Sequence, residues 1–116
     1  MSNPILLEND SLIIANRQFS SRLMLGTGKY KNFQEAKEAI TLSGCEILTV
    51  AIRRAQSSTV DGIDKLLNNL DWTKIWLMPN TAGCQTSEQA IRLAFLGREI
   101  LKNLNYVDNE FLKLEV

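Results

Sequence analysis

The feature that most constrains the fold is an alternation of short apolar runs with segments of helical periodicity. Apolar runs occur at Leu23–Leu25, Ile47–Ile52 and Ile75–Met78, and each is followed by a segment with apolar residues at helical spacing. A fourth run, Phe111–Val116, begins another strand. Parallel strands need long crossovers, which helices supply while covering a face of the sheet. The order β, α, β, α, β, α, β therefore predicts a parallel α/β sheet.

Two parallel architectures fit this order. Four strands are the start of an open doubly wound sheet or half of a closed eight-stranded barrel, and periodicity does not choose between them. A complete barrel takes about 250 residues. The 116 residues here therefore supply at most half of one, and we expect a single domain over residues 1–116.

Local signals mark the ends of the elements. Asn16 favours a tight turn between Leu12–Ile14 and Gln18–Phe19, which predicts a small hairpin ahead of the sheet. Helices are expected to begin after Asn32 and Thr86, each followed three residues later by Glu or Gln, and Gly44 and Pro79 are expected to end a helix and a strand. The apolar helix faces are expected to comprise Phe33, Ala36, Ala39 and Ile40; Ile63, Leu66, Leu67 and Leu70; and Ala90, Ile91, Ala94, Ile100 and Leu101.

Composition excludes several classes of function. Thirteen basic and thirteen acidic residues are scattered along the chain, so no basic stripe indicates nucleic acid. Two cysteines, Cys45 and Cys84, with no histidine leave no ligand set for a metal, and they favour two reduced thiols. No window approaches the roughly 20 apolar residues of a membrane span, and residues 1–10 lack the pattern of a signal or transit peptide.

Functional side chains of parallel α/β proteins lie at the carboxyl ends of strands. The candidates there for substrate binding are Gly26 and Lys29 in GTGKY, Arg53 and Arg54 in AIRR, and Asn80 and Thr81 in PNTAG. Each has a structural alternative: a turn that needs glycine, an arginine pair in solvent, or polar groups that satisfy a loop backbone. GTGKY lacks the spacing of a Walker phosphate loop.

Lys113 and Glu115 are the candidate catalytic residues. Side chains alternate along a strand, so these two share one face while Leu112 and Leu114 occupy the other. A lysine inside a barrel suits covalent catalysis, because a neutral amine attacks a ketone, and Glu115 then suits the role of acid and base. The alternative is an edge strand whose polar face meets water.

The motifs GTGKY, AIRR, MPNTAGC and FLKLEV follow successive strands in the order found in thiazole synthases, and the chain resembles this family from about Leu12 to Val116. The resemblance implies a closed (β/α)8 TIM barrel, of which this chain covers the hairpin and strands one to four. It also implies an enzyme that joins 1-deoxy-D-xylulose 5-phosphate, dehydroglycine and sulfur from a carrier-protein thiocarboxylate into the thiazole phosphate of thiamin. Lys113 then matches the imine-forming lysine and Glu115 its acid and base partner.

The same resemblance sets expectations about partners. It implies a sulfur-carrier protein, an enzyme that produces dehydroglycine, no cofactor or metal of its own, and a homo-oligomer at full length. Composition and similarity to plastid-encoded algal copies favour the chloroplast stroma, with bacterial cytoplasm as the alternative. We expect the isolated half-barrel to be inactive and prone to aggregate, because its strand edges are unpaired. The alternatives are another imine-forming barrel such as an aldolase, and a half-barrel that acts as an interaction module.

Overall fold

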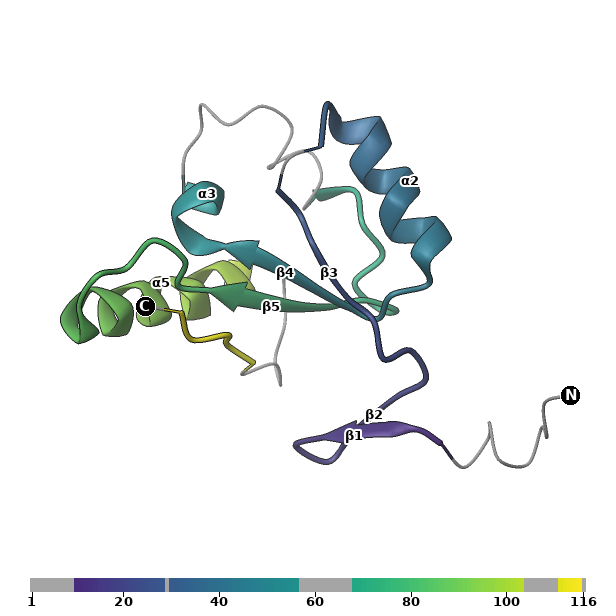
Figure 1. Cartoon of the computed structure of the whole chain (residues 1–116), viewed down its shortest axis with the longest axis horizontal. Coiled ribbons are helices and arrows are strands. Elements are labelled where there is room, and N and C mark those ends of the chain that lie inside the picture. The colour runs from purple at the N-terminus through teal and green to yellow at the C-terminus, as the bar shows by residue number, and fades with distance from the viewer. Residues whose placement is uncertain (1–9, 29, 57–67, 104–110, 116) are drawn as a thin grey trace, which may run out of the picture.

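The computed structural model describes residues 10–28, 30–56, 68–103 and 111–115. Figure 1 shows a sheet of three strands with helices beside it and a separate two-stranded hairpin beyond one end of that sheet. The elements are β1 (Leu12–Ile14), β2 (Arg17–Phe19), β3 (Met24–Gly26), α2 (Phe33–Ser43), β4 (Ile47–Ala51), α3 (Ile52–Gln56), β5 (Trp76–Asn80) and α5 (Ser87–Asn103).

The hairpin forms where the sequence predicts it. Strands β1 and β2 pair in antiparallel fashion, with Leu12 opposite Phe19 and Ile14 opposite Arg17. Ala15 and Asn16 make the turn with positive φ angles of 51° and 66°. A two-residue hairpin turn of this kind needs positive φ at both central positions, which asparagine tolerates better than alanine. Asn16 therefore suits its position, and Ala15 takes a conformation that the hairpin imposes.

The main sheet is parallel and its strands follow one another in chain order. Strand β4 lies between β3 and β5, with Met24 beside Ile47 and Ile47 beside Trp76. Beyond β5, Lys113 forms an isolated parallel bridge with Asn80. The predicted fourth strand is thus represented, within the described residues, by a short segment next to the third.

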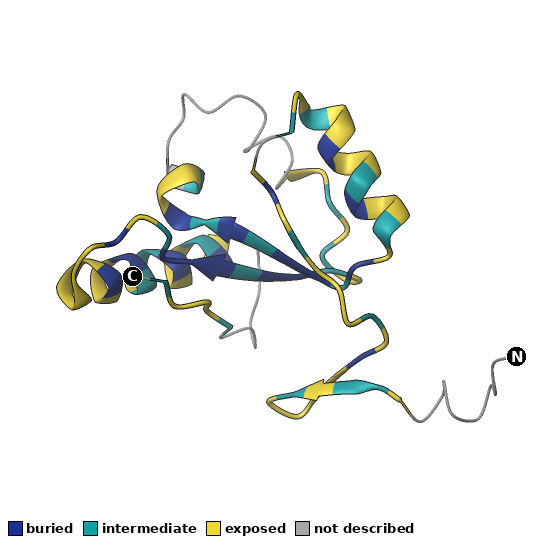
Figure 2. Cartoon of the chain, in the orientation of Figure 1, coloured by how far each residue is buried: buried dark blue, intermediate teal, exposed yellow. Residues whose placement is uncertain are grey.

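Both long helices cover the same face of this sheet. Leu48 packs with Ala36 and Ile40 of α2. Val50, which points to the same side as Leu48, packs with Leu101 of α5. In Figure 2 the buried residues concentrate on β4, β5 and the sides of the helices that meet them. Within the described residues, sequential strands with both long helices on one face are consistent with a barrel segment, whereas a doubly wound sheet carries helices on both faces.

The hairpin packs against the start of the opposite face. Phe19 of β2 forms a buried cluster with Ile47 and Trp76, and Phe111 packs against this cluster. Rings of Trp76 and Phe111 meet edge to face with centroids 5.4 Å apart. The Arg17 guanidinium lies 3.4 Å from the centroid of the Trp76 ring. These contacts attach the hairpin to the amino-terminal ends of β4 and β5.

The predicted helix caps are present. The Asn32 carboxamide oxygen accepts from the N–H of Glu35 at 2.9 Å, and Gly44 ends α2 with φ of 68°. The Thr86 hydroxyl accepts from the N–H of Gln89 at 3.2 Å. The Gln89 side chain does not complete the capping box, because its oxygen accepts from the N–H of the residue before Thr86.

The expectation that Pro79 stops the third strand is wrong. Strand β5 continues through Pro79, which pairs with Val50, and ends at Asn80. The Pro79 carbonyl accepts from the N–H of Lys113 at 2.9 Å, so its side of the backbone faces the segment 111–115. The N–H that proline lacks would point the same way. The ladder to β4 therefore loses no donor at Pro79.

The boundaries of two other expected strands also shift by one residue. The expected strand Leu23–Leu25 is observed as β3 from Met24 to Gly26, and Leu23 is exposed. The expected strand Ile47–Ile52 ends at Ala51, because the short helix α3 begins at Ile52. The helix predicted from Val60 lies almost wholly in 57–67, outside the described residues, and its last apolar position, Leu70, is half-buried against the α2 side of the core.

The apolar face predicted for α5 is partly wrong. Ile91 was expected inside, but 58% of it is exposed. Gly97 is buried instead, because a Cβ there would lie 2.9 Å from Cδ1 of Ile52 and 3.3 Å from Cβ of Pro79. Gly97 thus allows α5 to approach Ile52 and Pro79 closely, and the buried residues of α5 are Ala90, Leu93, Gly97 and Leu101.

Candidate functional site

The described candidate residues lie at one edge of the sheet. Because all strands of the sheet are parallel, their carboxyl ends meet there. Gly26 ends β3, Arg53 and Arg54 lie in α3 directly after β4, Asn80 ends β5 and Thr81 follows it. Lys113 and Glu115 lie beside the end of β5. Lys29 lies outside the described residues.

Lys113 and Glu115 form an ion pair. The Nζ atom of Lys113 lies 2.7 Å from Oε1 of Glu115, and the two side chains are 46% and 36% exposed. Such partly exposed pairs contribute only about 0–1 kcal/mol to stability. The contact is more significant for its geometry, since it holds a carboxylate within proton-transfer distance of an amine.

Asn80 lies next to Lys113 and is held on both sides of its carboxamide. Its Nδ2 atom donates to the hydroxyl of Thr49 at 2.9 Å, and its Oδ1 atom accepts from the N–H of Ala82 at 3.1 Å. The residue is buried, so these bonds fix its rotamer. Thr49 was not among the predicted site residues. The signal for it is a lone hydroxyl in the apolar run of β4, on the face opposite Leu48 and Val50.

Thr81 contacts the backbone of the lysine segment. Its N–H donates to the carbonyl of Lys113 at 3.2 Å. Its hydroxyl accepts from the N–H of Glu115 and donates to the carbonyl of the same residue, each at 2.8 Å. The Thr81 side chain is fully buried. Three hydrogen bonds thus join Thr81 to the two candidate catalytic residues.

The two arginines extend toward different neighbours of β4. A Cβ built on Gly28, after β3, would lie 2.7 Å from Nη1 of Arg54. A Cβ built on Gly83, after β5, would lie 3.2 Å from Nη1 of Arg53. The guanidinium groups therefore lie against glycines on opposite sides of β4 and do not converge as a clamp on one anion. Both arginines are exposed.

Neither Gly26 nor Gly28 has a positive φ, and only Gly28 allows a close approach by another residue. Of the described glycines, only Gly44 and Gly83 have positive φ. Gly26 has nothing within 4 Å of a built Cβ, and its carbonyl accepts from the hydroxyl of Tyr30 at 3.3 Å. Gly28 leaves room for Arg54. The turn expected to need the conformational freedom of glycine therefore does not use it at these two positions.

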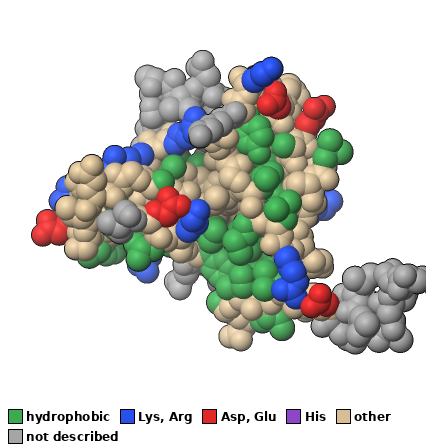
Figure 3. All heavy atoms as spheres, viewed as in Figure 1, with side chains coloured by type: hydrophobic (Ala, Val, Ile, Leu, Met, Phe, Trp, Pro, Cys, Tyr) green, Lys and Arg blue, Asp and Glu red, His purple; other side chains and the backbone are tan. Residues whose placement is uncertain are grey.

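Below the polar residues the same sheet face is apolar. A hollow of about 310 Å³ is lined by residues of the hairpin, the sheet and the segment 111–115, namely Ile14, Ala15, Met24, Ile47, Met78, Phe111 and Leu112. Figure 3 shows hydrophobic side chains gathered on the face viewed, close to adjacent basic and acidic side chains. A polar layer with an amine and a carboxylate thus lies above an apolar layer, which is a common arrangement in ligand sites.

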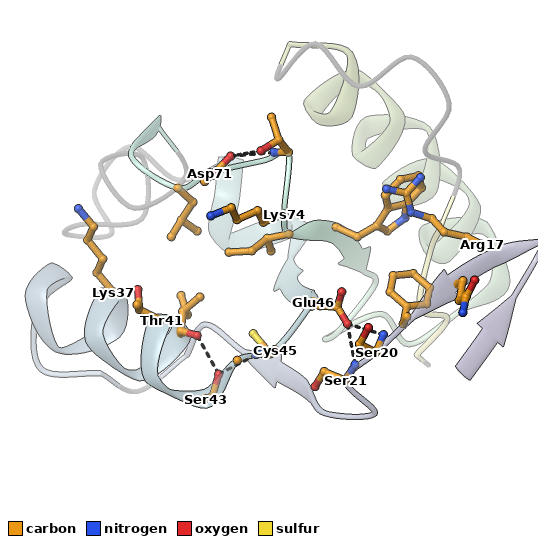
Figure 4. A pocket seen from close by; sticks show the side chains of 18 of the residues that line it. Arg17, Ser20, Ser21, Lys37, Thr41, Ser43, Cys45, Glu46, Asp71 and Lys74 are labelled. Atoms are coloured by element: carbon orange, nitrogen blue, oxygen red, sulfur yellow. Dashed lines mark hydrogen bonds between the residues drawn. The ribbon is translucent and has the colours of Figure 1, made fainter. Parts of the chain in front are cut away.

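A larger open cavity of about 1030 Å³ lies at the opposite end of the sheet, between the hairpin, the end of α2 and the loop before β5. In Figure 4 the Glu46 carboxylate points toward Ser20 and Ser21. Its Oε1 atom accepts from the N–H of each serine at 2.6 Å. These bonds connect the hairpin to β4. None of the predicted site residues lines this cavity.

Asp71, at the rim of this cavity, has a pKa below the ordinary value of an aspartate. Hydrogen bonds from the Thr73 hydroxyl and the Thr73 N–H lower the pKa of Asp71, with a smaller contribution from Lys74. Because the folded pKa is lower, its contribution to stability is present above the unfolded value of about 3.9 and is lost as pH falls through the folded value. A carboxyl carbon NMR titration should show this low midpoint.

Variants at Thr73 separate the causes of the Asp71 shift. Thr73→Val removes the side-chain hydrogen bond, which is the largest cause, so the Asp71 midpoint should rise toward the value of an ordinary aspartate. Thr73→Ser keeps a hydroxyl and should leave the midpoint low. Equal midpoints in Thr73→Val and the original protein would contradict this assignment.

The described residues contain no cluster of three or more His, Cys, Asp or Glu side chains that could hold a metal ion. Over the same residues, no helix combines the length and apolarity that crossing a membrane requires. Cys45 and Cys84 are both buried and free, as the sequence predicts. They lie in separate core clusters, one beside α2 and one beside α5.

Sequential parallel strands covered by helices, with the candidate residues at the carboxyl edge, define a parallel α/β protein. A model of the family described as "Thiazole biosynthesis protein ThiG" matches residues 13–116. The chain belongs to this ThiG family, as the strand-end motifs indicate, and is thus related to enzymes of thiamin thiazole biosynthesis.

Several relatives support this assignment. The chain is 67% identical over 107 residues to a thiazole synthase of Emiliania huxleyi, covering 92% of this chain and 39% of that protein. It is 58% identical over 109 residues to a thiazole synthase of Pyropia yezoensis, covering 94% and 39%. A "Bifunctional protein ThiO/ThiG" of a Nostoc strain is 57% identical over 115 residues, covering 98% and 18%. The chain therefore spans about two fifths of the length of these two algal thiazole synthases.

Proposed function

We propose that this chain supplies the imine-forming part of a thiazole synthase active site. The observation that carries the proposal is the 2.7 Å contact between Nζ of Lys113 and Oε1 of Glu115 at the carboxyl edge of a parallel sheet, in a chain of the ThiG family. In this function the protein converts 1-deoxy-D-xylulose 5-phosphate, dehydroglycine and carrier-protein thiocarboxylate sulfur into the thiazole phosphate of thiamin.

Lys113 is the nucleophile in this proposal. Its neutral amine attacks the ketone carbon of the sugar phosphate and forms a C–N bond, and the resulting carbinolamine loses water to give the imine. Glu115 accepts a proton from the amine nitrogen and returns one to the departing hydroxyl. The short Nζ to Oε1 distance supports both transfers, because a general base must lie within hydrogen-bond reach of the proton it moves.

The remaining candidate residues have supporting roles. Asn80 lies beside Lys113 with its carboxamide fixed by Thr49, and we propose that it limits the orientation of the bound sugar. Arg53 and Arg54 are exposed cations at the same edge and would attract the anionic substrates. Gly26 and Lys29 belong to the GTGKY motif, and we propose that this motif contacts substrate.

The proposed setting is a closed barrel and, from the algal and cyanobacterial relatives, a plastid or bacterial cytoplasm. Sequential strand order with helices on one face supports the barrel. A sulfur-carrier protein, an enzyme that produces dehydroglycine and a second copy of the protein are the partners that this function implies.

Borohydride trapping tests the proposal. The whole native protein, at its natural chain length, is incubated with 1-deoxy-D-xylulose 5-phosphate, reduced with borohydride and digested, and the modified peptide is identified by mass spectrometry. The proposal expects the mass of one reduced sugar adduct on Lys113. Modification only at other lysines, or the same modification of Lys113 without added sugar phosphate, would refute it.

A further inference from the structure

Thr81 directly follows the last residue of β5, and its carbonyl accepts a hydrogen bond from a residue of the next turn. The chain turns directly after this residue, and the Thr81 carbonyl accepts from the N–H of Cys84 at 3.3 Å. In a continuing parallel ladder that carbonyl would accept from the N–H of Glu115, since the Thr81 N–H already donates to the carbonyl of Lys113. The end of β5 therefore leaves one ladder position without its usual backbone acceptor.

The Thr81 hydroxyl occupies this ladder position. It accepts from the N–H of Glu115 and donates to the Glu115 carbonyl, both at 2.8 Å. A hydroxyl suits both contacts, because it carries one donor and two acceptor lone pairs. The side chain is fully buried, so water does not compete for these bonds. One side chain thus extends the pairing of the lysine segment beyond the last residue of β5.

This pairing controls where the Glu115 carboxylate points. While Glu115 stays extended, its side chain and that of Lys113 are on the same face, and their charged atoms meet at 2.7 Å. If the backbone of Glu115 turned, the carboxylate would leave the amine even with both residues unchanged. Among the described contacts, the Thr81 hydroxyl is the one that holds the Glu115 backbone.

We infer that Thr81 is a positioning residue, which acts through the Glu115 backbone to keep the carboxylate beside the Lys113 amine. The inference rests on the proposed function, because it assigns the proton transfer to Glu115. It gives Thr81 an indirect role and does not require its buried hydroxyl to contact substrate.

The structural half of this inference is measured by hydrogen exchange in the whole native protein. Thr81→Val keeps the shape of the side chain but removes the hydroxyl, so the Glu115 amide should exchange about tenfold faster relative to amides of α2. Thr81→Ser keeps the hydroxyl and should exchange at nearly the original rate. If Thr81→Ser loses protection at Glu115 as fully as Thr81→Val, the hydroxyl is not responsible and the inference fails. This comparison decides the matter even if the valine variant folds poorly.

The catalytic half is measured by the pH dependence of imine trapping on Lys113. Glu115→Gln should abolish the part of the pH dependence of the trapping rate that a carboxylate causes. Thr81→Val should abolish the same part. The double variant should be no slower than Glu115→Gln alone, because both changes remove one function. If Thr81→Val only damaged the folded structure, it would lower the trapping rate at every pH. The double variant would then be slower than Glu115→Gln alone.

The outcomes separate this inference from the proposed function. Absence of any adduct on Lys113 in the original protein would refute the proposed function itself. An adduct that forms in Thr81→Val with the original rate and pH profile would overturn the positioning role alone. Loss of the carboxylate-dependent part in Thr81→Val, with its retention in Thr81→Ser, is the expected result.

Discussion

Replacing Lys113 with arginine is expected to abolish the borohydride-trapped sugar adduct of the whole native protein. The guanidinium of arginine keeps a positive charge and can still contact Glu115, but it is not deprotonated in proteins and does not form an imine with a ketone. The folded structure should be retained, since the side chain is partly exposed and the segment is held by backbone bonds. Mass spectrometry of the peptide around residue 113 should show no added sugar.

Lys102 provides a matched control for the Lys113 substitution. It also faces a glutamate, Glu99, at 3.6 Å, but it lies near the end of α5. Lys102→Arg should leave the adduct on Lys113 and the turnover rate unchanged. If the adduct persists in Lys113→Arg, the nucleophile is another residue, and the imine role of Lys113 must be abandoned.

Glu115→Gln distinguishes binding from proton transfer within the same experiment. The amide cannot accept a proton, so the adduct should still form, but about 10²–10⁴ times more slowly. Turnover should fall while the affinity for the sugar phosphate changes little. An unchanged rate would remove Glu115 from the proton-transfer step without affecting the assignment of Lys113.

Truncating Leu48 to alanine is expected to produce the largest loss of stability. Leu48 is fully buried on the central strand β4 and packs against Ala36 and Ile40 of α2. Leu→Ala changes in such cores cost about 2–5 kcal/mol, because they remove apolar contacts and leave a cavity. Urea unfolding of the whole protein should show a lower midpoint with an unchanged slope.

Leu42 offers the same substitution at an exposed position of the adjoining helix. It is 84% exposed on α2, so Leu42→Ala should change the free energy of unfolding by no more than about 0.5 kcal/mol. Leu48→Met keeps most of the volume and should cost less than about 1.5 kcal/mol. Similar losses in Leu48→Ala and Leu42→Ala would show that the α2 side of the sheet is not the core described here.

Features that depend on near neighbours in the chain were predictable from the sequence. Asn32 caps α2 through an N–H three residues away, and Gly44 ends it through its own left-handed conformation. The hairpin turn at Asn16 is equally local. The boundary at Pro79 was predicted wrongly because the N–H that proline lacks faces the segment 111–115 and not β4, so the pairing of β5 with β4 continues through Pro79. Which side the missing N–H faces depends on pairing with segments distant in the chain.

The candidate site also has features that the sequence predicts and features that it does not. Alternation along residues 111–115 predicts that Lys113 and Glu115 share a face, and their contact confirms this. The position of Arg53 and Arg54 after β4 is also evident from the sequence. Their separation is not, because it depends on where the flanking loops place Gly28 and Gly83.

The sequence by itself determined the α/β class, the order of the strands and the two long helices, the caps at Asn32, Gly44 and Thr86, and the family through four strand-end motifs. These features follow from local backbone preferences and from side-chain periodicity, both of which can be read along the chain. Tertiary structure alone decided that both helices cover one face, that Gly97 and not Ile91 is buried, and that Thr81 holds Glu115. Each of these depends on contacts between segments distant in the chain, which periodicity does not specify.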